Sequence, residues 1–357
     1  MLFVFGEIRR HPLGTEFPRC GEEYIPYHLF NKIGGVSVSA ARNSETLKTQ
    51  GGKIVRYKKS QLFGPLRTFD SDRKVRKILE GLLKEKKMGV ANIHSFLPRS
   101  SAFLKNKGTR VIITSHGGFP SFQNLPLWKR PLAGLRKRVE ASSIRSADLL
   151  VAINKYMVGE YERYQTKKPV KLIYSGVDTH LYKPQNGKWN EPLKVVFLSR
   201  LHPQKGIWEF IELAKSSDAE FIIIGHDQLN LNNRIRTFIK DHPNIKFFPD
   251  ASEQTKVELL GKSHLFVSLS KGYDPTPNVL YEAMGSGMAI ASTLKHYRED
   301  VLEDKAIWIN RWQDVLPYLD DKKLLQSRAR KLRKSAERFF NTERMAKEYK
   351  GLGKISL

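Results

Sequence analysis

The sequence of 357 residues contains a single cysteine, Cys20, and no long apolar run. One cysteine excludes an internal disulfide bond, which fits a reducing compartment. No stretch approaches the ~18 consecutive apolar residues of a membrane-spanning helix, and the apolar run in MLFVFGEIRR is too short for a signal peptide. We therefore expect a cytoplasmic protein that is soluble or bound peripherally at the inner face of a membrane.

The common metal-binding and cofactor-binding motifs are also missing. The histidines show no metal-ligand spacing, and there is no H-E-x-x-H, no D-x-D, no cysteine cluster, no P-loop and no G-x-S-x-G. The segment GSGMAI, residues 285–290, lacks the third glycine of a dinucleotide fingerprint. It also lies between a helix and a strand, which is the wrong order for that motif. We expect no metal and no cofactor.

Acidic residues are few, because 36 Asp and Glu stand against 62 Lys and Arg, and the formal net charge is +26. The excess lies in the N-terminal half. Residues 1–190 carry 35 cationic and 14 anionic side chains, a net +21, whereas residues 191–357 carry 27 and 22, a net +5. The positive charge of the N-terminal half favours an anionic partner, namely membrane headgroups, a diphosphate-linked acceptor or nucleic acid.

The length and the apolar content suffice for two domains. Apolar strands alternate with helical periodicity in both halves, from LFVF to KLIYSGV and from KVVFLSR to AIAS, which predicts parallel α/β sheets. The stretch YKPQNGKWNEPLK contains Pro, Gly and Asn and has no apolar period. We expect a first domain over residues 1–183, a linker over 184–193 and a second domain over 194–338.

The segment FVSLSKGYDPTPNVLYEAMGSGMAIAS, residues 266–292, is the most informative part of the chain. It predicts a strand, a loop, a helix and a second strand. Thr276 suits the N-cap of the helix, and Pro277 suits its first position. The backbone N–H groups of Asn278 and Val279 would then point out of the helix start, where they attract phosphate.

Two carboxylates flank this helix start. Asp274 lies in the loop, and Glu282 shares a helix face with Asn278, four residues before it. A nucleotide sugar needs such an arrangement, because its diphosphate takes N–H donors and its hydroxyl groups take carboxylates.

The same residues resemble the signature of retaining glycosyltransferase family 4, in which two acids separated by seven residues surround a "PNVLLEAMA" core. The resemblance implies that Glu282 holds the ribose of the nucleotide and that Asp274 contacts the transferred sugar. The chain departs from the family pattern twice: Asp274 is shorter than the usual Glu, and Pro275 replaces a Gly and has no N–H to donate.

Other segments resemble the same family in the same order. YSGVDTHLYKP resembles the end of its first domain, and VVFLSRLHPQKG resembles the start of its second. The resemblance implies that Arg200 and Lys205 grip the donor diphosphate and stabilise the charge that develops on it. NKIGGVSVSAARNSETL resembles the first glycine loop, in which Gly34 and Gly35 would let the backbone approach the donor.

Two histidines follow predicted strands in the first half. His116, in IITSHGG, resembles the histidine that contacts the transferred sugar in this family. His94, in NIHSFLPRS, is a similar histidine at the end of a strand, and we expect it to line the acceptor site together with Arg99.

Two basic segments combine cations with apolar residues at helical spacing. Residues 73–87 and residues 128–145 would each either lie on an anionic membrane or pack as a surface helix on the sheet of their own domain. For the second segment we expect membrane contacts from its aromatic and cationic residues: Trp128, Lys129, Arg130, Arg136, Lys137 and Arg138.

The resemblance covers nearly the whole chain and implies the GT-B architecture, in which two Rossmann-like doubly wound domains enclose an active-site cleft and a C-terminal helix, here residues 339–357, crosses back to the first domain. It implies a metal-independent transfer of a hexose from a UDP-sugar or GDP-sugar to an acceptor hydroxyl, with retention and no general base. The acceptor would be a cell-surface glycan or a lipid-linked saccharide, and domain closure would assemble the cleft.

Two alternatives remain open at this point. A nucleotide-sugar epimerase shares the fold but needs further acids and a histidine, and we find no matching set. A nucleic-acid-binding protein would use the basic half, yet no recognition motif is present and the basic segments have little aromatic interleaving.

Overall fold

The computed structural model of the chain describes residues 2–6, 53–57, 64–85, 89–94, 96–115, 130–164, 166–227, 229–271 and 278–352. The chain divides into two compact units. The first unit consists of Met1–Tyr174 and Met345–Leu357, and the second consists of Ser175–Arg344.

This division differs from the expected boundary at residue 183. Residues 175–183 and the expected linker, residues 184–193, both belong to the second unit. The reason is Lys188, which is 3% exposed. Its ammonium group donates hydrogen bonds to the carbonyl oxygens of Ser263 and Ser286, at 2.6 and 2.8 Å, and thereby fixes the segment to that unit.

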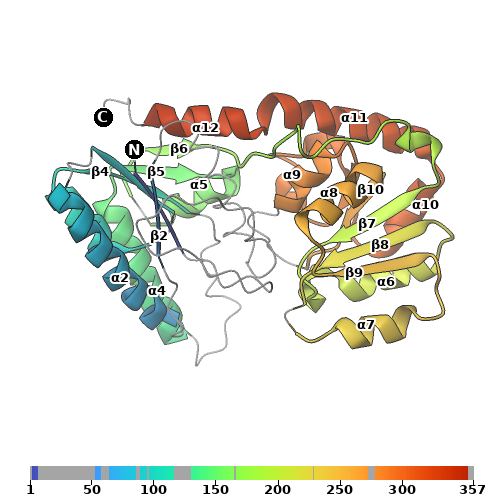
Figure 1. The fold of residues 1–357 in the computed structure, drawn as a ribbon, viewed down its shortest axis with the longest axis horizontal. Coiled ribbons are helices and arrows are strands. Elements are labelled where there is room, and N and C mark those ends of the chain that lie inside the picture. The colour runs from blue at the N-terminus through green and yellow to red at the C-terminus, as the bar shows by residue number, and fades with distance from the viewer. Residues whose placement is uncertain are drawn as a thin grey trace. The chain divides into compact units, whose positions relative to one another are not determined.

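The first unit contains a six-stranded sheet in the order β2-β1-β3-β4-β5-β6, and all its pairs are parallel. The strands are β1 (Leu2–Gly6), β2 (Lys53–Tyr57), β3 (Val90–Ile93), β4 (Arg110–Thr114), β5 (Leu149–Ala152) and β6 (Val170–Leu172). The described helices between them are α2 (Gly64–Glu85), α3 (Pro98–Asn106), α4 (Arg130–Ser146) and α5 (Lys155–Glu162). Figure 1 shows α2 and α4 side by side.

Helices cover both faces of this sheet. Val75 and Leu79 of α2 are fully buried in one core together with Ile93 of β3. The last helix, α12 (Thr342–Gly351), contributes Met345 and Tyr349 to the core on Ile112 and Val151, whose side chains point to the other face. Helix α12 thus covers the face of this sheet opposite to α2.

The second unit contains a six-stranded sheet in the order β12-β11-β10-β7-β8-β9, again with parallel pairs. The strands are β7 (Lys194–Leu198), β8 (Glu220–Gly225), β9 (Ile245–Pro249), β10 (Leu265–Ser268), β11 (Ala289–Ser292) and β12 (Ile307–Trp308). The main helices are α6 (Ile207–Lys215), α7 (Asn232–Ile239), α8 (Glu253–Lys262), α9 (Asn278–Gly285), α10 (Leu316–Leu319) and α11 (Lys322–Phe339). Short 3-10 turns include η4 (Lys188–Asn190) and η5 (Pro203–Lys205).

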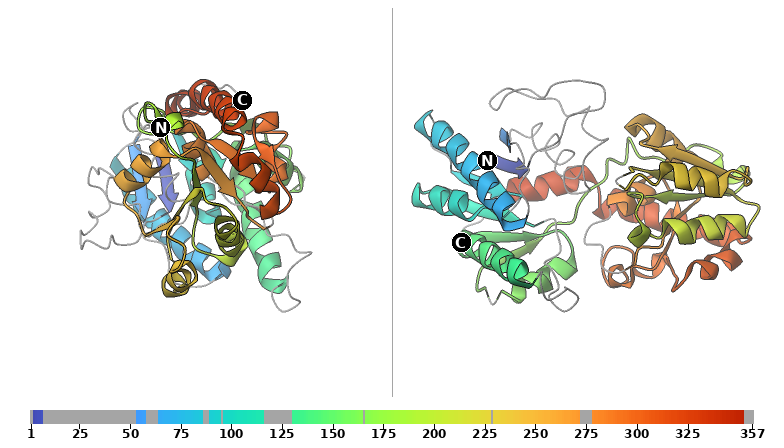
Figure 2. Two further views of the ribbon diagram at one scale, coloured as in Figure 1. Left: turned by 90° about the vertical axis from the view of Figure 1, so that its right-hand side faces the viewer. Right: turned by 90° about the horizontal axis from the view of Figure 1, so that it is seen from below.

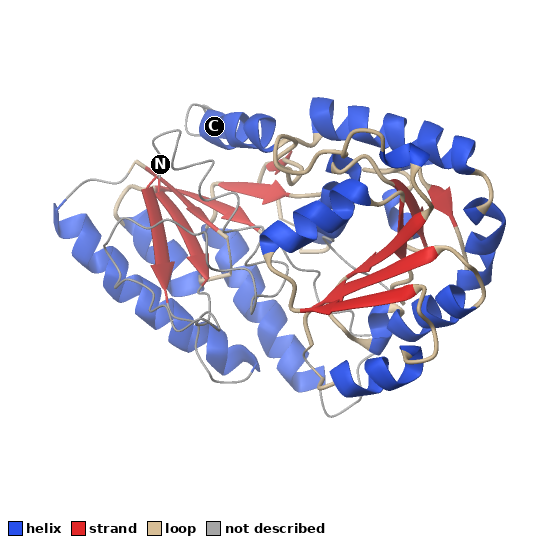
Figure 3. Cartoon of the chain, turned by 45° about the vertical axis from the view of Figure 1, so that its right-hand side comes forward, coloured by secondary structure: helices blue, strands red, loops and turns tan. Residues whose placement is uncertain are grey.

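The connections of this sheet place α6 and α7 on one face and α8 and α9 on the other, as Figures 1 and 2 show. Figure 3 shows helices around the strands of each unit. The chain reverses its direction of winding between β7 and β10, and ligands of open α/β sheets bind beyond the carboxyl ends of the strands at such a point. The two parallel sheets confirm the predicted class of two doubly wound α/β domains.

Candidate functional site

The candidate site of the second unit lies beyond the carboxyl ends of β7 and β10. β7 is apolar and buried, and it ends at Leu198, after which Ser199 and Arg200 begin a polar loop. β10 is also buried and ends at Ser268. Because the two strands pair in parallel, their following loops meet at one edge of the sheet.

Gly206 allows the loop after β7 to approach β10. It has a φ of 78°, which an L-residue rarely adopts. A Cβ at this position would lie 2.4 Å from Cβ of Leu269 and 2.5 Å from the carbonyl oxygen of Leu269. The backbone of Lys271 also donates a hydrogen bond to the carbonyl of Gln204, at 2.7 Å. The glycine therefore fixes the backbone position of its neighbour Lys205.

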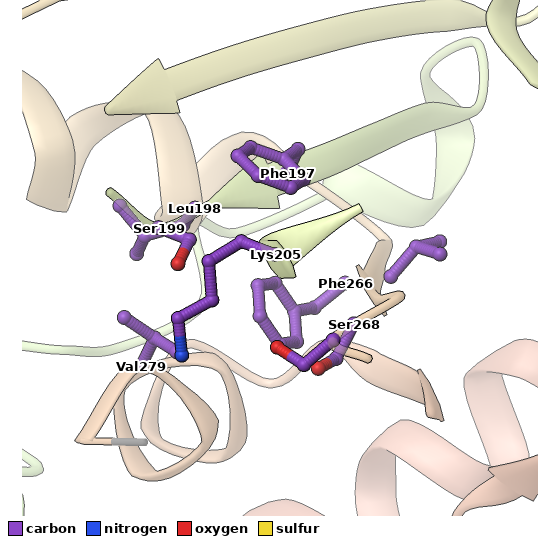
Figure 4. Close-up of a pocket in the computed structure, with 9 residues that line it drawn as sticks. Phe197, Leu198, Ser199, Lys205, Phe266, Ser268 and Val279 are labelled. Carbon is purple, nitrogen blue, oxygen red and sulfur yellow. The ribbon is translucent and has the colours of Figure 1, made fainter. Parts of the chain in front are cut away.

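Lys205 borders a small pocket at this edge of the sheet (Figure 4). Its side chain is half-buried and extends past Ser199 to Val279, in the first turn of α9. A lysine ammonium beside the N-terminal turn of a helix adds a full positive charge to the partial positive charge of that helix end. This arrangement suits an anion such as phosphate. The pocket is lined by Phe197, Leu198, Ser199, Lys205, Phe266, Val267, Ser268, Ser270 and Val279.

Arg200 and Asn278 lie in the same part of the second unit. Arg200 is exposed and follows β7 by two residues, while Asn278 is half-buried and begins α9. The structure thus brings four of the predicted diphosphate-binding residues to the ends of two neighbouring strands: Arg200, Lys205, Asn278 and Val279.

Glu282 lies one turn further along α9 and is 2% exposed. Its Oε2 atom is 3.2 Å from Nζ of Lys256, on α8, and the same ammonium is 2.8 Å from Oε2 of Glu253. The second oxygen of Glu253 accepts a hydrogen bond from the hydroxyl group of Tyr182. The carboxylate that we expect to hold the ribose therefore belongs to a network that joins α8, α9 and the segment before β7.

Sequence reasoning did not identify Lys256 or Glu253 as part of this site. Both lie on α8, far from Glu282 in the chain, and α8 is an ordinary charged helix with a Ser252 cap, whose hydroxyl accepts from the backbone of Thr255. No local pattern distinguishes Lys256 from the other surface lysines. Only the position of α8 beside α9 in the folded protein distinguishes Lys256 from them.

Several predicted site residues lie outside the described part of the chain. They are Gly34, Gly35, His116, Trp128, Lys129, Asp274 and Thr276, and of Arg130 only the backbone is described. Their roles remain predictions.

The predicted acceptor residues follow β3 in the first unit. His94 is 5% exposed, and its ring lies 5.8 Å from that of Tyr349. Arg99 is exposed, and its guanidinium lies 5.7 Å from the ring centre of Phe69. The buried carboxylate of Asp72 accepts hydrogen bonds from the backbone of Arg99, at 2.7 Å, and of Ser100, at 2.8 Å, and so fixes the start of α3.

The two basic segments differ in the structure. In α2, Val75 and Leu79 are fully buried, so the apolar face of this helix packs on its own sheet and is not available to a membrane. In α4, Leu135 is 39% exposed beside the exposed cations Arg136, Lys137 and Arg138. Arg136 also forms an ion pair with Glu140, at 2.7 Å.

Among the residues that the structure describes, no helix combines the length and the apolar character that a bilayer-spanning segment needs. Nor do they contain three or more His, Cys, Asp or Glu side chains grouped as metal ligands.

Solved structures of similar fold include glycosyltransferases. Sucrose-phosphate synthase from Thermosynechococcus elongatus matches with a TM-score of 0.77 at 13% identity, over 99% of this chain and 98% of that chain. Anabaena Alr3699/HepE in complex with UDP-glucose matches with a TM-score of 0.72 at 13% identity, over 99% and 100%. A glycosyltransferase from Rickettsia africae matches with a TM-score of 0.68 at 13% identity, over 99% and 97%. No curated protein matches the sequence at the required significance.

Family models match consecutive parts of the chain. Residues 33–181 match the model described as Glycosyltransferase Family 4, and residues 178–337 match the model described as Glycosyl transferases group 1. These two matches together span most of the sequence and agree with the two parallel-sheet units. With the structural neighbours, they identify the chain as a glycosyltransferase with the GT-B fold.

Proposed function

We propose that this glycosyltransferase moves a hexose from a UDP-sugar or GDP-sugar to an acceptor hydroxyl, with retention of the anomeric configuration and without a metal ion. The part of this proposal that concerns the donor rests on one observation. The ammonium of Lys205 lies beside the first turn of α9, at the carboxyl ends of β7 and β10. Structures of the similar Anabaena protein with UDP-glucose and with UDP support a uridine nucleotide as the first donor to test.

Each residue of the donor site has a role in this proposal. Arg200 and Lys205 neutralise the diphosphate as it leaves, because fixed cations stabilise a charge that grows in the transition state. The N–H groups at Asn278 and Val279 bind the same phosphates, and Glu282 accepts hydrogen bonds from the ribose. Asp274 and His116 contact the sugar, and Gly34 and Gly35 let the backbone approach the donor. The departing phosphate takes the proton of the acceptor.

The proposed acceptor is a cell-surface glycan or a lipid-linked saccharide, bound by the first unit at His94 and Arg99. Exposed Leu135 beside Arg136, Lys137 and Arg138 supports contact of α4 with an anionic membrane. Each such cation contributes roughly 1 kcal/mol at a membrane surface, so a few of them are enough for peripheral binding. Trp128, Lys129 and Arg130 extend this proposed contact.

Isothermal titration with UDP, GDP and ADP in the presence of EDTA tests the donor site. We expect one nucleotide to bind selectively. The Lys205→Met variant should weaken it about tenfold or more, because a hydrogen bond to a charged group contributes roughly 1.5–3 kcal/mol. Lys240→Met, at a lysine that is 69% exposed directly after α7, is the matched control and should bind like the wild type.

The reaction is tested by NMR of the product formed from the selected nucleotide sugar. Retention predicts an anomeric configuration equal to that of the donor, and metal independence predicts an unchanged rate with EDTA. Absence of nucleotide binding, together with salt-sensitive binding of DNA, would contradict the proposal and favour a nucleic-acid-binding protein. Epimerisation of the nucleotide sugar without an acceptor would favour the epimerase.

A further inference from the structure

Lys256 is held between two carboxylates in the second unit. Its Nζ atom is 2.8 Å from Oε2 of Glu253 and 3.2 Å from Oε2 of Glu282. The side chains of these residues are 13%, 21% and 3% exposed, respectively. One ammonium group thus serves two carboxylates, and the more buried of the two is Glu282.

The other side of this ammonium is also fixed. Nζ of Lys256 lies 5.5 Å above the ring of Tyr182, which is 1% exposed. The hydroxyl of Tyr182 donates to Glu253, and its backbone carbonyl accepts from Nη1 of Arg333, at 2.6 Å. Because Tyr182 is itself held from both ends, the position of Lys256 between α8 and α9 is well defined.

A carboxylate as buried as Glu282 is costly unless a cation and hydrogen bonds compensate for the lost water. Lys256 supplies the cation. If the ammonium were removed, the carboxylates of Glu253 and Glu282 would face each other without it and repel. Glu282 would then leave its position, although its backbone in α9 would remain.

We propose that Lys256 is a positioning residue that sets the orientation of the Glu282 carboxylate toward the ribose and thereby determines the preference of the site for ribonucleotides over 2′-deoxyribonucleotides. This inference rests on the proposed function, in which Glu282 accepts hydrogen bonds from the ribose hydroxyl groups. A carboxylate held by a fixed ammonium accepts hydrogen bonds from a defined direction, and a nucleotide without the 2′-hydroxyl loses one such bond.

The test compares UDP with 2′-deoxy-UDP by isothermal titration on the full-length protein. If GDP is the nucleotide that binds, GDP and 2′-deoxy-GDP are compared in the same way. The ratio of the two Kd values reports the ribose contact alone, since both ligands carry the same base and diphosphate. We expect the wild type to prefer UDP by about tenfold or more, as one hydrogen bond to a charged group predicts. Lys256→Met should reduce the ratio to about threefold or less, whereas Lys256→Arg should restore part of it.

Lys262→Met is the matched control, because Lys262 is on the same helix, is 41% exposed and pairs with Glu258 at the surface. It should keep the wild-type ratio. Should Lys256→Met fail to fold, judged by circular dichroism, Lys256→Gln takes its place. An unchanged ratio in the folded variant overturns the inference, even if the affinity for UDP falls. A wild type that binds UDP and 2′-deoxy-UDP equally also overturns it.

Failure of the proposed function gives a different result. In that case the wild type binds neither UDP, nor GDP, nor inorganic pyrophosphate, which is the probe for the phosphate half of the site. If the protein binds pyrophosphate and nucleotides but Lys256→Met does not change the ratio of the two Kd values, the proposed donor site stands. Only the proposed role of Lys256 is then refuted.

Discussion

Lys188 and Arg333 converge on the C-terminal end of α9. The ammonium of Lys188 donates to the carbonyl of Ser286, at 2.8 Å, and Nη1 of Arg333 donates to the carbonyl of Gly285. Cations at this end complement the helix dipole. Burial, and then the charge of Arg333, lower the pKa of Lys188 to about 7. Both residues hold the far end of the helix whose first turn lies at the pocket that Lys205 borders.

Arg333→Gln should destabilise the protein. The guanidinium also donates to the carbonyls of Tyr182, at 2.6 Å, and Thr179, at 3.0 Å, and its side chain is only 18% exposed. The variant leaves buried carbonyls without donors, which costs roughly 1–3 kcal/mol for each such group. We expect a loss of about 3 kcal/mol in urea unfolding and weaker nucleotide binding, because the position of α9 is less defined.

Arg330→Gln is the control on the same helix, since Arg330 is exposed. A surface change of this kind usually stays within about 0.5 kcal/mol. Equal stability of the two variants would show that the contacts of Arg333 with the end of α9 do not hold this region together.

His264 predicts a pH dependence of stability. The residue is fully buried, its Nδ1 atom accepts a hydrogen bond from the backbone of Lys194, at 2.9 Å, and its Nε2 atom contacts the carbonyl of Lys188, at 2.7 Å. Burial, opposed by the hydrogen bond with the Lys188 carbonyl and helped by the charge of Lys188, lowers its pKa from 6.5 to about 4. A proton on Nδ1 would also break the bond from Lys194.

Between pH 4 and 6.5 the unfolded chain therefore binds a proton at His264 that the native protein does not bind. Stability should rise with pH in this window, by at most about 1.4 kcal/mol per pH unit from this residue. Urea unfolding at pH 5 and 6.5 should show a smaller increase in His264→Gln than in the wild type. His180→Gln, at a side chain that is 89% exposed, should retain the wild-type increase; an equal slope in all three proteins would refute the assignment.

Asp72 predicts a stability effect in the first unit. Its fully buried carboxylate accepts hydrogen bonds from the backbone of Arg99 and from both the backbone and the hydroxyl of Ser100, the latter at 2.5 Å. Asp72→Ala removes the acceptor from the start of α3 and should cost about 3 kcal/mol, more than an ordinary N-cap. Asp72→Asn, which keeps one oxygen, should cost less.

Asp70→Ala is the control for Asp72. Asp70 lies on the same helix and forms ion pairs with two nearby cations of α2, Arg73 and Lys74. Pairs of this kind contribute about 0.5 kcal/mol. If thermal melts placed both alanine variants at the same Tm, the capping role of Asp72 would be disproved.

The strands and helices near the donor site could be predicted from the sequence because their signals are local. The apolar runs that became β7 and β10 are short and bounded by polar residues, and α9 (Asn278–Gly285) lies within the predicted helix. The predicted cap Thr276 and first residue Pro277 lie outside the described residues. The roles of Arg200 and Lys205 were predicted from the resemblance of VVFLSRLHPQKG to the family. Local chemistry and spacing were sufficient for the strands and the helix.

The place of the expected linker, residues 184–193, in the second unit has a physical reason. Pro184 and Gly187 correctly indicated a segment without regular helix or strand, yet composition does not reveal that Lys188 is buried against two carbonyls far away in the chain. The same applies to Lys256, whose partner Glu282 lies on another helix. Long-range pairing of this kind depends on the packing of whole elements and leaves no periodic signal.

Gly206 and Gly187 give a matched pair that separates backbone strain from close packing. Both have a positive φ, 78° and 73°, but a Cβ at Gly206 would meet Leu269 at 2.4 Å, whereas a Cβ at Gly187 would meet nothing within 4 Å. Gly187→Ala should therefore cost only the strain of the left-handed conformation, about 1 kcal/mol. Gly206→Ala adds a clash with backbone and should cost about 2 kcal/mol more.

The variants Gly206→Ala and Gly187→Ala also test the position of Lys205. Displacement of the loop at Gly206 moves Lys205 away from the first turn of α9, so we expect Gly206→Ala to weaken nucleotide binding about tenfold or more at temperatures where the variant is still folded. Gly187→Ala should bind nucleotide like the wild type. Calorimetric titration at 15 °C measures both, and equal affinities in the two variants would mean that the close approach of this loop to β10 does not position the lysine.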